Sequence, residues 1–109
     1  DARPAPRFRG EAPEPRPGLR LGHIPGSKNV PFSTVLNADG TMKSALDLRA
    51  VFQASGVDLA KPAITTCGSG VTAAVLSLAL ERIGHRNHAL YDGSWAEWGM
   101  YDDLAVEKG

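Results

Sequence analysis

Apolar residues beyond position 31 recur with the spacings of helices and short strands. A helix is predicted to begin after Ser44, because Asp47 three residues later makes a variant of the capping box. Gly56 is a suitable C-terminal stop for this helix. The residues expected to form its apolar side are Leu46, Ala50 and Val51, with Phe52 adjacent.

Two short apolar runs, 63–66 and 88–91, are typical of strands because turn residues bound both of them. Between them, residues 73–83 are apolar almost throughout, with Ser77 as the polar residue in the middle. A helix of this kind is expected to be buried on most sides. Strands that alternate with helices favour an α/β domain with a mostly parallel sheet.

Two shorter helical segments are predicted before and after this pattern. Residues 32–36 are typical of a short helical turn. Ser94 has capping-box spacing to Glu97, so a short helix that carries Trp95 and Trp98 is expected there. We expect the two tryptophans to pack in the core or against another domain rather than to bind a ligand.

The first 31 residues differ from the rest, because they hold seven of the eight prolines. Prolines this dense oppose a regular helix or a central strand, so we expect a long ordered loop, with a disordered tail as the alternative. Five arginines lie within the first 20 residues. Arginines on a long loop of a small domain are candidates for anion recognition.

Length and composition exclude several classes of function. The 109 residues suffice for one domain, and 42% apolar with 22% charged residues is ordinary for a globular protein. A net charge of zero disfavours nucleic acid or an anionic membrane as a partner. No apolar run reaches the roughly 18 residues of a membrane span. The chain begins with Asp1 rather than Met, so we expect a fragment, and we place the protein in the cytoplasm.

Metal-ligating residues are few. The single cysteine, Cys67, excludes an internal disulfide and a zinc site of four cysteines. His85 and His88 flank a turn, but two ligands do not make a metal site, so we expect surface histidines. We therefore expect no metal and no cofactor.

Cys67 is the strongest candidate for chemistry, because it follows a predicted strand and precedes a predicted helix. Gly68 and Gly70 allow the loop to curl so that its N–H groups and those of the helix start point into one concavity. Such a cradle stabilises an anionic sulfur and lowers the thiol pKa, which makes a nucleophile. A buried structural cysteine is the alternative.

Five segments that follow one another along the chain carry a shared pattern: Asp1–Arg3, Arg7–Gly10, Gly22–Gly26 with Asn29 and Pro31, Cys67–Thr72, and Tyr91–Trp98. In this order they resemble the signatures of the rhodanese superfamily, and specifically of the 3-mercaptopyruvate sulfurtransferases. Cys67–Thr72 is similar to the active-site loop of these enzymes. Ser27 departs from the pattern, since alanine is usual at that place.

The resemblance implies a rhodanese-like α/β domain over residues 1–109, with a mostly parallel central sheet flanked by helices on both faces. It also implies the C-terminal, catalytic half of a two-domain enzyme. An N-terminal rhodanese-like domain, together with the first strand of this domain, is then expected outside the chain and would be its partner.

The activity implied by the resemblance is sulfur transfer in two steps. The Cys67 thiolate takes sulfane sulfur from 3-mercaptopyruvate, the small-molecule donor, which releases pyruvate and leaves a cysteine persulfide. A thiol, such as that of a thioredoxin-like protein, or cyanide then accepts the sulfur. Ser69 matches a serine proposed to act in catalysis with a His and an Asp of the N-terminal domain, and a small residue that merely fits the loop is the alternative.

The substrate-binding residues implied by the resemblance lie in the loop and in the N-terminal stretch. They are Arg7, Arg16, Gly68, Gly70, Val71 and Thr72. The loop amides hold negative charge, and the Thr72 hydroxyl is expected to cap or brace the loop. Arg7 and Arg16 match two arginines that bind the donor carboxylate in the mercaptopyruvate enzymes. Positions 68 and 69 lack the basic side chains typical of thiosulfate-specific relatives.

Three rival functions differ in how well the residues fit them. A phosphatase of the same fold needs an arginine at the end of a longer loop, and Ala73 stands in its place. A non-catalytic rhodanese-like binding module usually lacks the cysteine that is present here. A thiosulfate:cyanide sulfurtransferase (rhodanese) is the main alternative to the mercaptopyruvate enzyme.

Three further polar residues are expected to have structural roles. His23 is expected to make a structural hydrogen bond rather than to act in catalysis. Arg9 is a structural candidate on the arginine-bearing stretch. Asp92 is either a turn residue or a brace for the cysteine loop.

Overall fold

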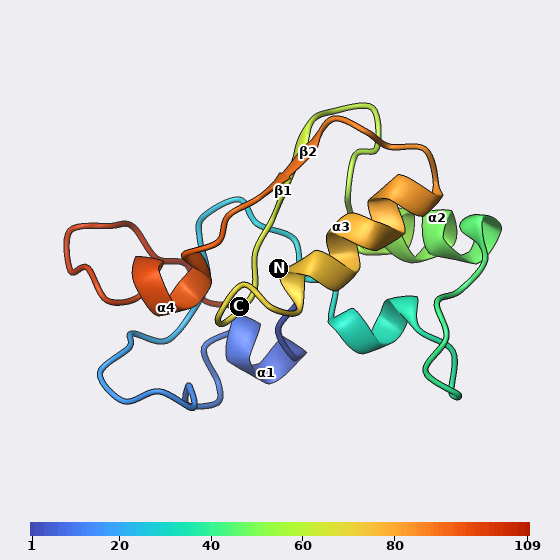
Figure 1. Ribbon diagram of the computed structural model, residues 1–109. Helices are drawn as coiled ribbons and strands as arrows, with labels where there is room; N and C mark the ends of the chain where they lie inside the picture. The colour runs from blue at the N-terminus through green and yellow to red at the C-terminus, as the bar shows by residue number, and fades with distance from the viewer.

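Strands and helices alternate in the second half of the chain (Figure 1). The computed structural model describes all 109 residues. Strands β1 (Ala63–Thr65) and β2 (His88–Leu90) pair in parallel, with Ile64 opposite Ala89. Helix α3 (Ala73–Arg82) provides the crossover that a parallel pair needs. The predicted α/β class with a parallel sheet is confirmed.

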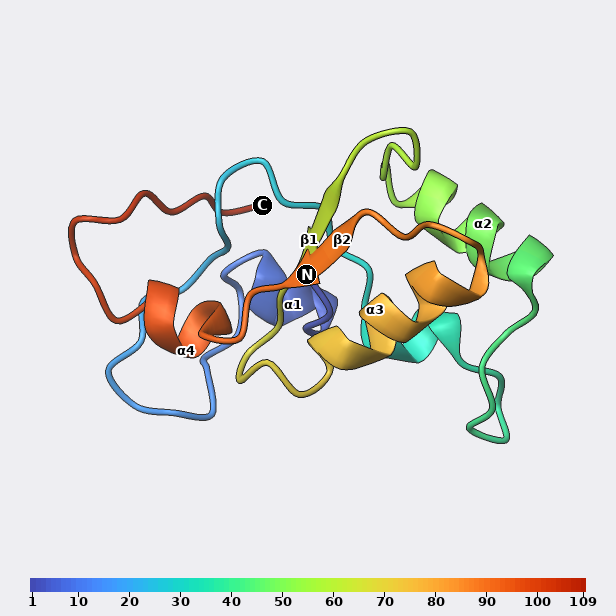
Figure 2. The ribbon, with the colours of Figure 1, turned by 45° about the horizontal axis from the view of Figure 1, so that its top comes forward.

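Helix α2 (Ala45–Ala54) and a short 3₁₀ helix, η1 (Phe32–Val35), form where the sequence predicts them. The Ser44 hydroxyl caps α2 by accepting a hydrogen bond of 3.3 Å from the Asp47 amide. Both elements pack against α3, and α2 lies beside α3 in both ribbon views (Figures 1 and 2). The core between them and the sheet contains Ala2, Val30, Val35, Leu48, Phe52, Cys67, Ala73, Leu76, Ala79, Leu80 and Ile83.

The buried face of α2 agrees with the predicted one only in part, at Phe52 and at Val51, which packs against the core. Leu48 and Phe52, which lie one turn apart, are buried, whereas Leu46 is 78% exposed and Ala50 is also exposed. Apolar residues surround much of this helix, so the periodicity alone leaves its orientation open. The contacts with α3 and η1 decide the orientation.

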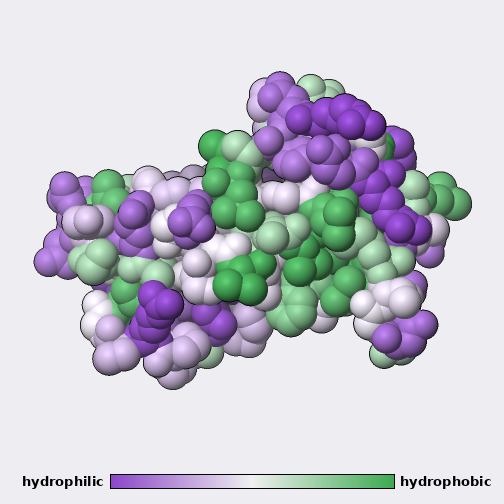
Figure 3. All heavy atoms as spheres, viewed as in Figure 1, coloured by the Kyte–Doolittle hydropathy of each residue, from purple (hydrophilic) through white to green (hydrophobic).

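Helix α3 covers one face of the small sheet. The hydroxyl groups of Thr65 and Ser77 form a hydrogen bond of 2.8 Å, so Thr65 points toward α3. Ile64 points the opposite way and is 73% exposed, and Leu78 on the outer side of α3 is exposed as well. Figure 3 shows this apolar surface over the strands and α3. The prediction that α3 is buried on most sides is wrong, because its neighbours cover only the inner side.

The proline-rich N-terminal stretch is ordered and contains one helical turn, α1 (Ala5–Phe8). A helix was not expected there, but Pro6 stands in the first turn, where the missing N–H group would have no partner in any case. The Ala2 amide donates to the Thr66 carbonyl at 2.8 Å, and the Phe32 amide donates to the Ala2 carbonyl at 3.0 Å. These bonds hold the start of the chain beside β1.

The last helix, α4 (Ser94–Trp98), follows β2 and lies at the same end of the molecule as α1 and residues 67–72 (Figures 1 and 2). Parallel strands end at one edge of a sheet, and the loops that follow them form its usual binding edge. None of the helices is long and apolar enough to cross a membrane. The fold therefore brings the cysteine loop, α4 and the arginine-bearing stretch together.

Candidate active site

The cysteine loop, residues 67–72, joins β1 to α3 and is held from one side by α4. The Trp95 amide donates to the Cys67 carbonyl at 2.9 Å, and the Ala96 amide donates to the Gly68 carbonyl at 2.8 Å. Because α4 binds these carbonyls, the amides that follow are free to turn toward the sulfur. The anchor uses the unpaired N–H groups that every helix start provides.

Ser94 supports the same loop in a way that the sequence analysis did not predict. Its hydroxyl accepts a hydrogen bond of 3.1 Å from the Cys67 amide and donates one of 2.9 Å to the Tyr91 carbonyl. Ser94 is the one non-glycine residue with a positive φ, at 53°. The predicted capping box with Glu97 is wrong, because Gly93 occupies the N-cap position and the Ser94 hydroxyl is used by the loop.

The Cys67 sulfur is surrounded by hydrogen-bond donors. Cys67 is 1% exposed, and the Gly70 amide lies 2.9 Å from its Sγ atom. Burial raises the pKa of the thiol, but hydrogen bonds from the Thr72 hydroxyl and from the amides of Ala73, Gly70 and Ser69 outweigh it, so the pKa lies below its usual value. This is the anion cradle that the strand–loop–helix pattern predicts. It favours a thiolate, the reactive form of cysteine.

The donors differ in detail from the predicted set. The Gly70 amide makes the direct hydrogen bond to the sulfur, and the amides of Ser69 and Ala73 also lower the pKa of the thiol, so Ala73 was missed. Val71 is exposed and lines no part of the pocket described below. Gly70 is needed at its place, because its φ is +99° and a Cβ there would lie 2.7 Å from the Asp92 carbonyl oxygen. The Asp92 backbone therefore packs directly against the loop at Gly70.

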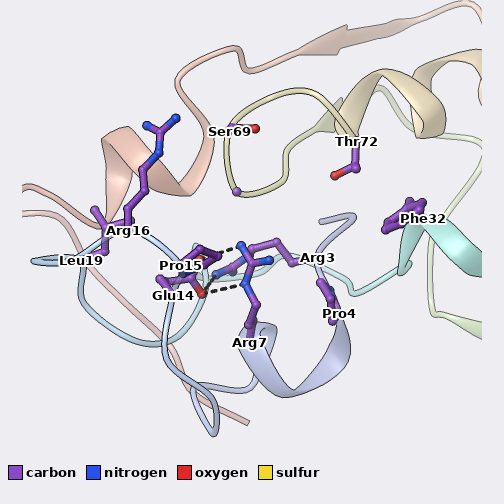
Figure 4. A pocket seen from close by; sticks show the side chains of 11 residues that line it. Arg3, Pro4, Arg7, Glu14, Pro15, Arg16, Leu19, Phe32, Ser69 and Thr72 are labelled. Atoms are coloured by element: carbon purple, nitrogen blue, oxygen red, sulfur yellow. Dashed lines mark hydrogen bonds and ion pairs between the residues drawn. The ribbon is translucent and has the colours of Figure 1, made fainter.

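A pocket of about 360 Å³ lies between the loop and the N-terminal stretch (Figure 4). It is lined by Arg3, Pro4, Arg7, Glu14, Pro15, Arg16, Leu19, Phe32, Gly68, Ser69 and Thr72. The structure thus brings together five predicted site residues from two stretches that lie far apart in the sequence: Arg7, Arg16, Gly68, Ser69 and Thr72. Cys67 does not itself line the pocket and is buried at the start of the loop that forms one wall.

Four alternating charges form a row of ion pairs, three of which, Arg3, Glu14 and Arg7, line the opposite wall. Glu14 binds Arg7 through two hydrogen bonds, Nη2 to Oε1 at 2.9 Å and Nε to Oε2 at 3.3 Å. Its Oε2 atom also accepts from Nη1 of Arg3 at 3.2 Å, and Arg3 in turn binds Asp1 at 2.8 Å. Sequence reasoning missed Arg3 and Glu14. The signal available for Glu14 was an acidic residue within a stretch of prolines and arginines.

The predicted substrate arginines differ in their surroundings. Arg7 touches the cysteine loop, since a Cβ at Gly68 would lie 2.6 Å from its Nη2 atom. Arg16 is exposed, has no ion-pair partner in the chain, and extends away from the Arg7–Glu14 pair in Figure 4. Arg9 points elsewhere and pairs with Glu11 on the surface.

Comparison with known proteins agrees with this architecture. The rhodanese-like domain family matches residues 1–101. The chain belongs to the rhodanese-like domain family. This rhodanese-like domain is 56% identical over 107 residues to the 3-mercaptopyruvate sulfurtransferase of Escherichia coli K12, an alignment that covers 98% of the chain and 38% of that protein. It is 50% identical over 99 residues to the thiosulfate sulfurtransferase of Rattus norvegicus, covering 90% of the chain and 33% of that protein.

Among solved structures, the Tum1 protein of Saccharomyces cerevisiae is similar throughout. The TM-score is 0.88 at 35% sequence identity, and the match covers 99% of the rhodanese-like domain and 38% of Tum1. The chain therefore spans little more than a third of the proteins that it resembles.

The other polar and aromatic candidates have structural roles in the rhodanese-like domain. His23 has its Nδ1 atom 2.8 Å from the Phe8 carbonyl oxygen and stacks on the Phe8 ring, which confirms the structural expectation. Trp95 is buried beneath the Arg3 guanidinium, 4.8 Å from the ring centroid. The Trp98 indole N–H donates to the Ala105 carbonyl.

The two remaining histidines form no metal site. His85 and His88 are half-buried rather than at the surface, with ring centroids 6.2 Å apart. The Nε2 atom of His85 lies 2.8 Å from the Lys61 carbonyl oxygen. No group of three or more His, Cys, Asp or Glu side chains is arranged to hold a metal ion.

Proposed function

We propose that this rhodanese-like domain moves sulfane sulfur from 3-mercaptopyruvate to an acceptor through a persulfide on Cys67. The observation that carries the proposal is the hydrogen bond of 2.9 Å from the Gly70 amide to Sγ, which belongs to a ring of donors that lowers the pKa of the thiol below its usual value. Such a ring favours a negative sulfur both before and after the transfer, since the outer sulfur of a persulfide is also anionic. The relatives named above support sulfur transfer as the class of reaction.

The proposed reaction has two half-reactions. The Cys67 thiolate attacks the donor sulfur, a sulfur–sulfur bond forms, and the carbon–sulfur bond of the donor breaks. The electron pair of that bond leaves with the organic fragment as the enolate of pyruvate, which takes up a proton. The thiolate of the acceptor, or cyanide, then attacks the outer sulfur and regenerates the Cys67 thiolate.

The donor's carboxylate is proposed to bind at the arginine wall. Arg7 and Arg16 line the pocket beside the cysteine loop, and an arginine fork matches a planar carboxylate. Gly68 and Ser69 carry no positive charge, so the wall of the loop offers little to a compact dianion. This distribution of charge favours a donor whose carboxylate lies some distance from its sulfur.

The loop residues share the remaining proposed roles. Gly68, Gly70 and Thr72 are proposed to bind the substrate as members of the loop, whereas Val71 lies outside the pocket. The groups that lower the pKa of the thiol add Ser69 and Ala73 to those proposed to stabilise charge. Ser69 lies exposed in the pocket wall, where a proton-transfer role with a His and an Asp of a second domain is proposed. The Cys67 thiolate is the nucleophile.

The proposal includes the wider organisation of the protein. Residues 1–109 are proposed to form a single domain, the catalytic C-terminal half of a tandem enzyme that acts in the cytoplasm. The match to 38% of the bacterial relative supports a further part in the complete protein. A thioredoxin-like protein is the proposed thiol acceptor, and cyanide is a substitute for it.

The second candidate is a thiosulfate:cyanide sulfurtransferase, which the 50% identity to the rat thiosulfate enzyme favours. Turnover of 3-mercaptopyruvate and of thiosulfate by the purified protein separates the two candidates. We expect a larger kcat/KM for 3-mercaptopyruvate, and a larger value for thiosulfate would reverse the assignment.

Intact-mass measurement after treatment with each donor tests the chemical step itself. We expect the protein to gain the mass of one sulfur atom. A protein that gains no sulfur from either donor would instead be a non-catalytic binding module.

A further inference from the structure

We propose that Glu14 is a positioning residue that sets the direction in which Arg7 presents its guanidinium to the donor's carboxylate. This inference rests on the proposed function of the pocket. Glu14 is a charged side chain that is only 2% exposed, although it lines the same pocket as the two candidate substrate arginines. A carboxylate is buried at such a place only where strong partners compensate its loss of water.

The pairing with Glu14 occupies one edge of the Arg7 guanidinium and leaves another free. A guanidinium has five N–H donors in a rigid plane. Glu14 takes two of them, on Nε and Nη2, at 3.3 and 2.9 Å. The remaining three include one on each Nη atom, and this pair forms the end-on fork that fits a second carboxylate. Two bonds to one carboxylate also fix the plane of the group, and therefore the direction of the free fork.

Glu14 is itself held by a partner that cannot move easily. Its Oε2 atom accepts from Arg3, whose side chain is 1% exposed and also binds Asp1 and the Gly22 carbonyl. Figure 4 shows dashed lines that join Glu14 to the guanidinium groups of Arg3 and Arg7. The buried arginine thus acts as the anchor, and Glu14 transmits its position to Arg7.

The cysteine loop restricts the position of the Arg7 guanidinium from the other side. The Nη2 atom lies so close to the Gly68 backbone that a Cβ there would be 2.6 Å away. The guanidinium is therefore confined between a fixed carboxylate and the loop that carries the nucleophile. The free fork and the reacting sulfur are therefore held in a fixed relative position. A donor needs this, because its carboxylate and its sulfur must be bound at the same time.

Replacement of the carboxylate tests this role. In Glu14→Gln the side chain keeps its shape but offers Arg7 one accepting oxygen and one repelling amide. We expect KM for 3-mercaptopyruvate to rise about tenfold, with kcat changed by less than about twofold, because a misdirected arginine weakens binding of the carboxylate. The kcat/KM for thiosulfate is expected not to fall, since the variant pocket is more positive and a compact dianion does not depend on the fork direction.

The matched control is Glu11→Gln, which removes a carboxylate from the same stretch. Glu11 pairs with Arg9 on the surface and lies outside the pocket. Exposed ion pairs of this kind contribute little to stability, so we expect the kcat/KM for both donors and the unfolding temperature to be unchanged. Glu14→Asp keeps the negative charge but shortens the side chain by one methylene group. It is the second test variant if Glu14→Gln does not fold. We expect it to raise KM for 3-mercaptopyruvate by several-fold.

A binding measurement separates this inference from the proposed function. Titration with pyruvate, a product that keeps the carboxylate, is expected to show a Kd about tenfold higher for Glu14→Gln than for the wild type and for Glu11→Gln. An equal loss of kcat/KM with both donors would show that Glu14 only stabilises the fold. An unchanged KM for 3-mercaptopyruvate together with an unchanged Kd for pyruvate would show the same. If the wild type transfers sulfur from neither donor, the proposed function fails, and the pyruvate titration still decides the role of Glu14.

Discussion

The cysteine loop and the arginine stretch face each other across one pocket, but they are built from different parts of the chain. The loop binds charge with backbone amides, and its shape is held by hydrogen bonds to the start of α4. The arginine stretch binds charge with side chains, and those side chains are held by ion pairs with Glu14 and Asp1. A backbone site tolerates few substitutions at its glycines, whereas a side-chain site can be altered in affinity without loss of the nucleophile. We therefore expect changes on the loop side to affect whether the chemistry occurs, and changes on the arginine side to affect which donor is used.

Removal of the nucleophile is expected to have the largest effect. Cys67→Ser should lower sulfur transfer from either donor by about 10³-fold or more, because a hydroxyl is not ionised near neutral pH and the amide ring then surrounds no nucleophile. Steady-state assays with both donors and intact-mass measurement check this. Substantial turnover by the variant would show that another group accepts the sulfur.

Distortion of the backbone cradle comes next. Gly70→Ala forces a side chain onto a φ of +99° and into contact with the Asp92 carbonyl, so we expect a loss of about 2 kcal/mol in the free energy of unfolding and a large loss of turnover. Denaturant unfolding and the donor assays measure the two effects. Gly84→Ala is the matched control, because Gly84 also has a positive φ, +82°, but open space around the Cβ position. An equal loss of unfolding free energy in both variants would mean that only backbone strain, and not the close contact with Asp92, matters at Gly70.

A change at the contact between the two walls tests how they are related. In Gly68→Ala the added methyl group meets Nη2 of Arg7 at 2.6 Å, and Gly68 is not among the glycines with positive φ. We expect Arg7 to shift, which should raise KM for 3-mercaptopyruvate by roughly fivefold while thiosulfate turnover changes less. An equal decrease for both donors would place the effect in the loop rather than at Arg7.

The smallest expected effect concerns the pKa of the nucleophile. Thr72→Val removes the hydroxyl that hydrogen-bonds to Sγ, while burial of the sulfur remains, so the pKa of Cys67 should rise. Because the pKa of Cys67 is lowered in the folded protein, the thiolate should persist below the usual thiol pKa, and in the variant it should be lost at a higher pH. Ultraviolet absorbance of the thiolate as a function of pH measures this. A profile identical to that of the wild type would exclude the hydroxyl as a determinant.

Local features of the sequence predicted the loop side well and the arginine side only in part. The strand, glycines and helix around Cys67 are contiguous, so their joint geometry follows from short-range rules, and the amides of Ser69 and Gly70 that lower the thiol pKa lie within the expected loop. The prediction for Ser94 was wrong because its hydroxyl binds the amide of a residue 27 positions away. Glu14 was missed for a similar reason, since its burial depends on Arg3 and Arg7 meeting in space.

The orientation of a helix shows the same limit. Leu46 and Leu48 are both leucines of α2, yet one is exposed and the other is buried. Their order in the sequence does not distinguish them, because each lies on an apolar part of the helix. Packing against α3 and η1 selects the face of Leu48.

The amino-acid sequence alone was sufficient for the α/β class, for the position of Cys67 after a strand, and for the glycines that let amides turn toward its sulfur. Those properties depend on backbone conformation and on neighbours within a few residues. Only the tertiary structure decided which carboxylate meets which arginine, which face of α2 is buried, and how close Arg7 comes to the cysteine loop. Those properties depend on contacts between segments distant in the sequence, whose energies are set by burial and charge pairing that no local pattern contains.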